Sequence, residues 1–221
     1  MSLQALTGIA PEIVYRNRFR VARLARFLTI VDEIVAVRRQ CRVLDVGGIL
    51  EYWQGLEDLW QDRPLHFTLV NLCTETAPDD RFLCLSGNAC DLSQFPDNSF
   101  DIVHSNSVIE HIGRWSDQRR MAREVRRLAP RYFVQTPNFW FPLEPHYRMP
   151  FIHWLPESWR ACVVSHMACG FYPRARSFDE AQEIMQDARL LNAAAMAALF
   201  PDATIERERF GFITKSLIAI R

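Results

Sequence analysis

Hydrophobic and polar positions follow two different periods along this chain of 221 residues. From residue 19 to residue 35 the apolar side chains recur near the helical period of 3.6, which predicts one amphipathic helix. After residue 40, short apolar runs alternate with stretches of helical spacing. This alternation predicts parallel strands joined by right-handed helical crossovers.

Seven of the apolar runs have the length and composition of strands. They cover residues 41–46, 66–72, 82–85, 100–104 and 131–136, followed by a pair at 204–210 and 212–220 that turns at Gly211. Helical spacing covers residues 50–61, 115–129 and 189–200, and Ser177 with Glu180 forms a capping-box pattern. We therefore predict an α/β fold with a mostly parallel seven-stranded sheet, a C-terminal antiparallel hairpin and helices on both faces.

The pattern predicts a single domain, residues 1–221, made of four parts. A helical segment at 1–39 precedes a core at 40–136, and a last helix and hairpin occupy 189–221. Between them, residues 137–188 break the alternation, with six prolines and many large aromatic residues before residue 177. These rings either cover a substrate and exclude water or form a satellite core, and we leave both interpretations open.

The charges balance to a formal net charge of zero, with 26 basic and 26 acidic residues. No overall field therefore attracts nucleic acid or an anionic membrane, and we expect no nucleic-acid partner. Residues 1–42 hold eight arginines and three acids. The helix predicted there either lies on a membrane surface or packs against the fold. We favour the packed helix over peripheral membrane contact.

Cysteine spacing and the distribution of apolar residues favour a reduced, cytoplasmic protein. None of the six cysteines forms a C-x-x-C pair, which argues against structural zinc and fits free thiols in a reducing compartment. No apolar run follows a short basic start, so no signal peptide is expected. No run of about 18 apolar residues occurs, so no transmembrane segment is expected. The sequence carries no signal of the oligomeric state.

Polar residues follow four successive predicted strands at the points where the strands end. The carboxyl ends of parallel strands meet at one edge of a sheet, where such folds bind ligands. Glycine at a strand end also lets the backbone approach a ligand closely. The residues at these ends are Asp45, Gly47, Gly48, Asn71, Asn88, Ala89 and Asn106. They predict a ligand site. The absence of G-x-G-x-x-G after the first strand argues against a nicotinamide dehydrogenase.

One segment carries a resemblance to a known family. Gly87-Asn88-Ala89, the run FPDNSFDIV at residues 95–103 and Ser107-Val108-Ile109-Glu110-His111 together resemble class I S-adenosylmethionine-dependent methyltransferases. The closest likeness is to the type 11-like group that includes the ubiquinone and menaquinone biosynthesis enzymes. The resemblance covers residues 40–136, residues 199–203 and the final hairpin. It implies a Rossmann-like fold, S-adenosyl-L-methionine as cofactor and in-line methyl transfer to a small-molecule substrate.

The resemblance also implies roles for the residues at the strand ends. Asp45, Gly47 and Gly48 would flank the methionine part of the cofactor, and Asn71 would reach the ribose hydroxyls. Asn88 and Ala89 would contact the adenine, and Asn106 would line the cofactor near the methionine or the transferred methyl.

Two features depart from the family pattern. The later glycines of its loop are replaced by Ile49-Leu50-Glu51, and Asn71 stands where an acid is usual. The alternative to an enzyme is therefore a non-catalytic cofactor-binding or partner subunit with the same fold.

Methyl transfer needs a base only where the acceptor atom carries a proton, and histidine is the usual base near neutral pH. His111, just past the fourth strand, is the first candidate, unless Glu110-His111 serves only to begin a helix. His146 is the second candidate and His153 a weaker one. Glu110-His111 also resembles a metal-assisted subset, but Ser107 stands where that subset has a further glutamate, so no metal site is predicted.

Four arginines of the proline-rich segment are candidates for binding a carboxylate or phosphate on the substrate. Each could equally be a surface charge, which is the commoner role. They are Arg148, Arg160, Arg174 and Arg176.

Overall fold

The computed structural model describes residues 16–221 of the chain. The first part of the predicted N-terminal segment, residues 1–15, lies outside the described residues. Among the described residues, no helix is both long and apolar enough to cross a membrane.

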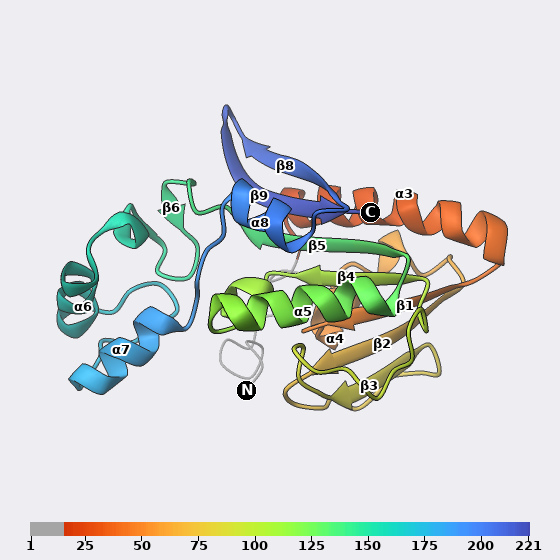
Figure 1. The fold of residues 1–221 in the computed structure, drawn as a ribbon, viewed down its shortest axis with the longest axis horizontal. Helices are drawn as coiled ribbons and strands as arrows, with labels where there is room; N and C mark the ends of the chain where they lie inside the picture. The colour runs from red at the N-terminus through yellow and green to blue at the C-terminus, as the bar shows by residue number, and fades with distance from the viewer. Residues whose placement is uncertain (1–15) are drawn as a thin grey trace. The chain divides into compact units, whose positions relative to one another are not determined.

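The sheet confirms the predicted α/β fold (Figure 1). Its seven strands have the order β3-β2-β1-β4-β5-β9-β8. Strand β1 pairs in parallel with both β2 and β4, β2 pairs in parallel with β3, and β8 and β9 form an antiparallel pair. The strands are β1 (Cys41–Val46), β2 (Leu65–Asn71), β3 (Phe82–Ser86), β4 (Ile102–Asn106), β5 (Arg131–Pro137), β8 (Thr204–Phe210) and β9 (Ile213–Ile220).

The helix predicted near the N-terminus is α3 (Arg18–Arg38). Asn17 caps it, because its side-chain oxygen accepts hydrogen bonds from the backbone N–H groups of Phe19 and Arg20. Its apolar face is buried, and the ring of Phe27 packs edge-on against those of Trp53 and Phe133. The helix therefore packs into the core, as we favoured, and its apolar face is not free for a membrane surface.

The helix predicted at residues 50–61 is shorter than expected. Helix α4 (Leu50–Gln54) ends at Gly55, and a 3₁₀ turn, η1 (Glu57–Leu59), follows. The carbonyl of Trp53 accepts hydrogen bonds from the indole Nε1 of Trp60, at 2.9 Å, and from the backbone N–H of Leu56. These bonds hold the chain in a turn, so the apolar spacing continues while the helix does not.

Residues 135–220 contain further short elements. They are β6 (Leu143–Glu144), β7 (Met149–Pro150), η3 (Ile152–Trp154), α6 (Glu157–His166), α7 (Phe178–Gln186) and α8 (Ala193–Leu199). Ser177 caps α7 by accepting a hydrogen bond from the N–H of Glu180. Helix α8 begins later than predicted. Residues 138–139 pair with Leu191 through a bridge and a backbone bond, and Asn192 then caps the helix.

The chain divides into two compact units. Unit 1 consists, among the described residues, of 16–106, 123–134 and 221, and unit 2 of 107–122 and 135–220. The chain passes between the units within α5 (Trp115–Leu128) and within β5. Unit 2 has a core of its own around Tyr147, Ile152 and Val164, which favours the satellite-core interpretation for part of the proline-rich segment. Trp140, Trp159 and other rings of that segment remain exposed.

Candidate functional site

The strand ends of unit 1 lie at one edge of the sheet, as predicted. Strands β3, β2, β1 and β4 are neighbours in that order and all run in parallel. Val46 pairs with Val70, and Asn71 pairs with Ser86. The residues that follow these strands therefore share one edge, and the cofactor-site candidates of unit 1 belong to it.

Asp45 has partners within the protein. Only 2% of the residue is exposed, and its Oδ2 accepts a hydrogen bond of 2.8 Å from the indole Nε1 of Trp53. Its Oδ1 lies 2.8 Å from Nδ1 of His104. Both carboxylate oxygens are therefore engaged with side chains of α4 and β4. The part of Asp45 in a cofactor site stays a prediction, and its visible role is to join these elements.

Gly47 and Gly48 shape the turn that leaves β1. Gly47 has φ +77°, a conformation that favours glycine, and its N–H donates to the carbonyl of Val70 at 2.7 Å. A Cβ on Gly48 would lie 2.3 Å from Oδ2 of Asp45. The second glycine is thus required because the aspartate carboxylate occupies the space beside it.

Asn71 ties the end of β2 to the same turn. Its amide nitrogen donates to the carbonyl of Gly48 at 3.2 Å, and its side-chain oxygen accepts from the N–H of Leu72 at 2.7 Å. Both ends of the side chain are engaged within unit 1. A contact with ribose hydroxyls would have to replace or share one of these bonds.

Asn88 and Ala89 begin the loop after β3. The side-chain oxygen of Asn88 accepts a hydrogen bond of 2.9 Å from the N–H of Cys90, which forms a tight turn. Asn88 is exposed and Ala89 is half-buried. The two residues thus lie on a loop held by its own turn, at the edge where the resemblance places an adenine.

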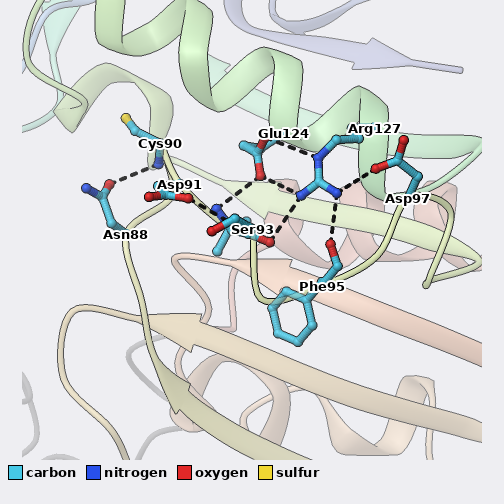
Figure 2. A network of polar contacts seen from close by, with 9 residues as sticks. Asn88, Cys90, Asp91, Ser93, Phe95, Asp97, Glu124 and Arg127 are labelled. Carbon is cyan, nitrogen blue, oxygen red and sulfur yellow. Dashed lines mark hydrogen bonds and ion pairs between the residues drawn. The ribbon is translucent and has the colours of Figure 1, made fainter.

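The FPDNSF run that carries much of the resemblance is fixed by one arginine of α5 (Figure 2). Arg127 donates hydrogen bonds to the carbonyls of Phe95 and Leu92, at 2.8 and 3.1 Å. It also pairs with Asp97 at 2.8 Å and with Glu124 at 2.7 Å. Glu124 in turn accepts from the N–H of Leu92. We call this set the Arg127 clamp, and it gives the motif a structural role in holding the loop after Asn88.

Asn106 ends β4, and its side-chain oxygen accepts a hydrogen bond from the guanidinium of Arg23. Arg23 belongs to α3 and is 6% exposed. A buried cation therefore lies at the strand end where the transferred methyl was expected. No local signal in the sequence separates Arg23 from the other arginines of this helix.

Two acids at the edge were not predicted. Glu75 accepts a hydrogen bond of 2.8 Å from the N–H of Leu50, the first residue of α4. Burial raises the pKa of Glu75, whose carboxyl lies beside that of Glu51. Glu51 is 9% exposed, and its Oε2 has no hydrogen-bond partner within residues 16–221. Glu51 stands where the family loop has a glycine. This replacement was the feature of the sequence that could have identified Glu51 as a site residue.

In unit 2 the structure brings the two histidine candidates together. His111 and His146 lie 35 positions apart in the sequence, yet their ring centroids are 4.7 Å apart with the planes nearly perpendicular. Each ring uses Nδ1 to contact the protein. His146 Nδ1 lies 2.6 Å from Oε1 of Glu144, and His111 Nδ1 lies 3.0 Å from the carbonyl of Asp187. In the neutral form of each ring, Nδ1–H donates to these oxygens and Nε2 is left as an acceptor.

Of the two residues that contact the histidine rings, Glu144 is held more firmly than Asp187. It is 2% exposed, and its Oε2 accepts from the N–H of Tyr147 at 2.6 Å. A buried carboxylate that orients a histidine through Nδ1 is the arrangement that prepares Nε2 to take a proton. His153 has a different setting, because its Nε2 lies 2.8 Å from the carbonyl of Phe139.

The electrostatics of His111 differ from those of a free histidine. Burial alone lowers the pKa of His111, but the hydrogen bond and charge of Asp187 and the charge of Glu110 raise it above 6.5. The same hydrogen bond from His111 lowers the pKa of Asp187 to about 2. His111 is thus held towards its charged form, so less of the ring is free to take a proton near neutral pH than in an ordinary histidine.

Glu110 is buried beside these rings. Its Oε2 accepts a hydrogen bond from the hydroxyl of Thr136 at 3.0 Å, and its Oε1 has no partner in the part of the chain that the structure describes. Burial raises the pKa of Glu110. Glu110, His111 and His146 offer three ligand atoms within 4.8 Å of one another, a set able to hold a metal ion. The hydroxyl of Ser107 donates to Gln135. Sequence reasoning missed this set because His146 is distant in the chain.

The comparisons with known proteins agree with the fold. Residues 65–131 match the family model of a methyltransferase domain. The matched segment runs from β2 to the first residue of β5, so it contains Asn71, Asn106 and His111 and leaves out the turn after β1. No curated protein matches the sequence.

Three solved methyltransferases show the same fold. The carbon methyltransferase of CurJ has a TM-score of 0.59 and 12% identity, over 96% of this chain and 56% of its own. An S-adenosylmethionine-dependent methyltransferase from Mesorhizobium loti has a TM-score of 0.52 and 14% identity, over 82% and 90%. The 1,6-didemethyltoxoflavin-N1-methyltransferase of Burkholderia thailandensis, solved with bound 1,6-didemethyltoxoflavin and S-adenosylhomocysteine, has a TM-score of 0.52 and 14% identity, over 98% of this chain and 79% of its own.

The chain is shorter than several of the proteins it resembles. It spans 46%, 64% and 56% of the first three solved methyltransferases in the comparison. At identities of this order the likeness concerns the fold.

Proposed function

We propose that the chain is a class I methyltransferase that transfers a methyl group from S-adenosylmethionine to a small-molecule acceptor, and the matched domain segment and the sheet topology support this. The observation that carries the proposal is the methyltransferase-domain match, because the matched segment contains both the strand-end asparagines of unit 1 and His111. Cytoplasmic location and a small acceptor remain part of this proposal.

The cofactor site we propose is the strand-end edge of unit 1. Asn88 and Ala89 would contact the adenine, Asn71 the ribose, Gly47 and Gly48 the methionine part, and Asn106 the region near the methyl. The residues fit such a ligand in charge as well. With the Asp45 carboxylate engaged internally, the unpartnered oxygen of Glu51 is the acceptor we assign to the cationic ammonium. When bound, S-adenosylmethionine supplies an electrophilic methyl group on a sulfonium.

The chain's own contribution to the reaction is proton removal and positioning. We assign the base to His146, because Glu144 holds its Nδ1 and leaves Nε2 free to accept a proton from the acceptor oxygen or nitrogen. His111 stands edge-to-face with His146, and the hydrogen bond and charge of Asp187 raise its pKa. We assign to His111 the role of orienting the ring of His146 and, when protonated, of stabilising negative charge that develops on the acceptor.

One observation favours a second candidate function. The side chains of Asp45 and Asn71 have partners within unit 1, and α4 begins directly after Ile49 where the family has glycines. A partner subunit that binds the cofactor without turnover would tolerate this arrangement. Saturable cofactor binding with no methyl transfer to any acceptor distinguishes this candidate from the enzyme.

The test is formation of S-adenosylhomocysteine from methyl-labelled S-adenosylmethionine. The protein is incubated with a protein-free extract of small metabolites, and the labelled product is identified by mass spectrometry. We expect a labelled small molecule with the wild type and a loss of about 100-fold or more in rate with His146→Gln. Cofactor binding together with label on no small molecule would replace the enzyme with the partner-subunit candidate.

A further inference from the structure

One cavity of about 910 Å³ lies within unit 2. Its wall includes the start of α5, part of α6 and the segment between α7 and α8. Glu144, which contacts Nδ1 of His146, also belongs to the wall, and so does Tyr147, whose N–H donates to Glu144. A volume of this size is typical of pockets that hold small organic molecules.

Three arginines line this cavity. No carboxylate of the described residues pairs with the side chain of Arg114, Arg160 or Arg189. The acids of the wall are mostly engaged elsewhere. Asp117 pairs with Arg120 at 2.7 Å, and Glu144 is held by His146 and the N–H of Tyr147.

The charge balance of the wall therefore favours a negative ligand. Against the three unpaired arginines, Glu157 is the one acid of the wall for which the described residues give no partner, and it is exposed. Unpaired guanidinium groups with fixed donor geometry bind carboxylates and phosphates through paired hydrogen bonds.

Two buried polar atoms of the wall also have no hydrogen-bond partner among the described residues. They are Nε of Arg160, which is a donor, and Nδ1 of His153. Burial lowers the pKa of His153, and Nε2–H donates to the carbonyl of Phe139 at 2.8 Å. In the neutral form that this shift favours, Nδ1 is an acceptor. A buried donor and a buried acceptor left without partners are unfavourable unless a ligand or water satisfies them.

We propose that this cavity binds the methyl acceptor as a small anion, a carboxylate or a phosphate whose body also carries a hydroxyl or an amine. Arg160, with Arg114 and Arg189, binds the anionic group, and Nδ1 of His153 accepts the hydrogen bond from the hydroxyl or amine. Phe139, whose ring lies edge-on to His153 at 5.5 Å, offers an apolar surface to the rest of the molecule. This inference rests on the proposed function and narrows its substrate class.

The experiment is calorimetric titration of the protein, without cofactor, with four probes. These are benzoate, 3-hydroxybenzoate, inorganic phosphate and, as the neutral control, phenol. We expect saturable binding of the anions, tighter binding of 3-hydroxybenzoate than of benzoate, and little binding of phenol. Whichever of phosphate and the carboxylates binds more tightly identifies the anionic group of the acceptor.

Variants locate the binding. Arg160→Gln is expected to weaken binding of the preferred anion by about tenfold, which corresponds to the loss of roughly one charged hydrogen bond. Arg189→Gln provides a second variant, at an exposed position of the wall. Arg174→Gln is the matched control, because Arg174 is exposed in the same segment but does not line the cavity. The proposal is overturned if no anion binds the wild type, or if both cavity variants bind like the control. Titration of the same samples with S-adenosylmethionine keeps a failure here distinct from a failure of the proposed function.

Discussion

The imidazole of His104 and the carboxylate of Asp45 form a buried pair, with Nδ1 of the histidine 2.8 Å from Oδ1 of the aspartate. The side chains are 1% and 3% exposed. Trp53 completes the group by donating its indole N–H to the other carboxylate oxygen. The acid that opens the family's glycine loop is thus part of the core of unit 1, and this relationship gives the first prediction.

Asp45→Asn is expected to lower the free energy of unfolding by about 2–3 kcal/mol, because an amide replaces an acceptor that is buried and charge-assisted. Urea denaturation monitored by tryptophan fluorescence measures the change. Asp80→Asn is the control, since Asp80 is exposed, and should change stability by less than about 0.5 kcal/mol. Equal stability of Asp45→Asn and the control would show that the buried pair does not form.

The Arg127 clamp gives a second prediction. Arg127→Ala removes the bonds to Phe95, Leu92, Asp97 and Glu124, and should destabilise the protein by about 2 kcal/mol. It should also weaken S-adenosylmethionine binding, because the clamp fixes the loop that begins at Asn88. Arg123→Ala, at an exposed position of the same helix, is expected to change neither quantity. Unchanged cofactor affinity in Arg127→Ala would confine the clamp to stability.

The pair of His111 and Asp187 gives a pH-dependent prediction. The raised pKa of His111 contributes stability that is present below about pH 6.5 and is lost as the pH rises through the folded-state pKa. The lowered pKa of Asp187 contributes stability above pH 3.8 that is lost as the pH falls towards 2. Asp187→Asn should therefore cost more stability at pH 6 than at pH 9.

The difference between the two pH values should be about 1 kcal/mol or less, because the side chains are 35% and 50% exposed and water screens their attraction. Urea denaturation at both pH values measures it. Asp179→Asn, exposed and one helix away in the sequence, should show a cost that does not change with pH. A cost for Asp187→Asn that is larger at pH 9 would contradict the sign of the shift.

The assignment of His146 as the base gives a fourth prediction. His146→Gln and Glu144→Gln should each lower kcat by about 100-fold or more, while His166→Gln, at an exposed position of α6, should leave kcat unchanged. Steady-state rates of S-adenosylhomocysteine formation measure this.

Removal of metal ions by a chelator distinguishes a histidine base from a metal site formed by the same side chains. A base without a metal predicts full activity after treatment with EDTA and gel filtration. Loss of activity that added zinc or magnesium restores would instead assign Glu110, His111 and His146 to a metal ion.

The sequence predicts the sheet because each strand is set by a local pattern. The first strand has the predicted bounds, and the terminal hairpin turns at Gly211, which has φ +59°. The length of α4 could not be predicted, since the indole of Trp60 competes for the carbonyl of Trp53. The start of α8 was missed for a similar reason, because Leu191 is held in a bridge to residue 138. Both depend on contacts beyond the window of helical spacing.

The site residues also divide into features set by local pattern and features set by distant contacts. Their positions at the strand ends follow from the α/β topology and were predictable. The directions of their side chains were not, because Trp53 and His104 reach Asp45 from two other elements. The meeting of His111 with His146 depends on the path of the proline-rich segment, and no pattern within either motif records that path.

The central claim is that the strand-end edge of unit 1 binds S-adenosylmethionine. Calorimetric titration with this cofactor tests it most directly, on the wild type and on Ala89→Phe, where the larger ring would fill the adenine position. Ser93→Phe, at an exposed position of the same loop, is the control. The account predicts one saturable site in the wild type and the control, and binding weaker by about tenfold or more, at least 1.4 kcal/mol, in Ala89→Phe. Absence of binding to the wild type, or equal binding by all three, would contradict it.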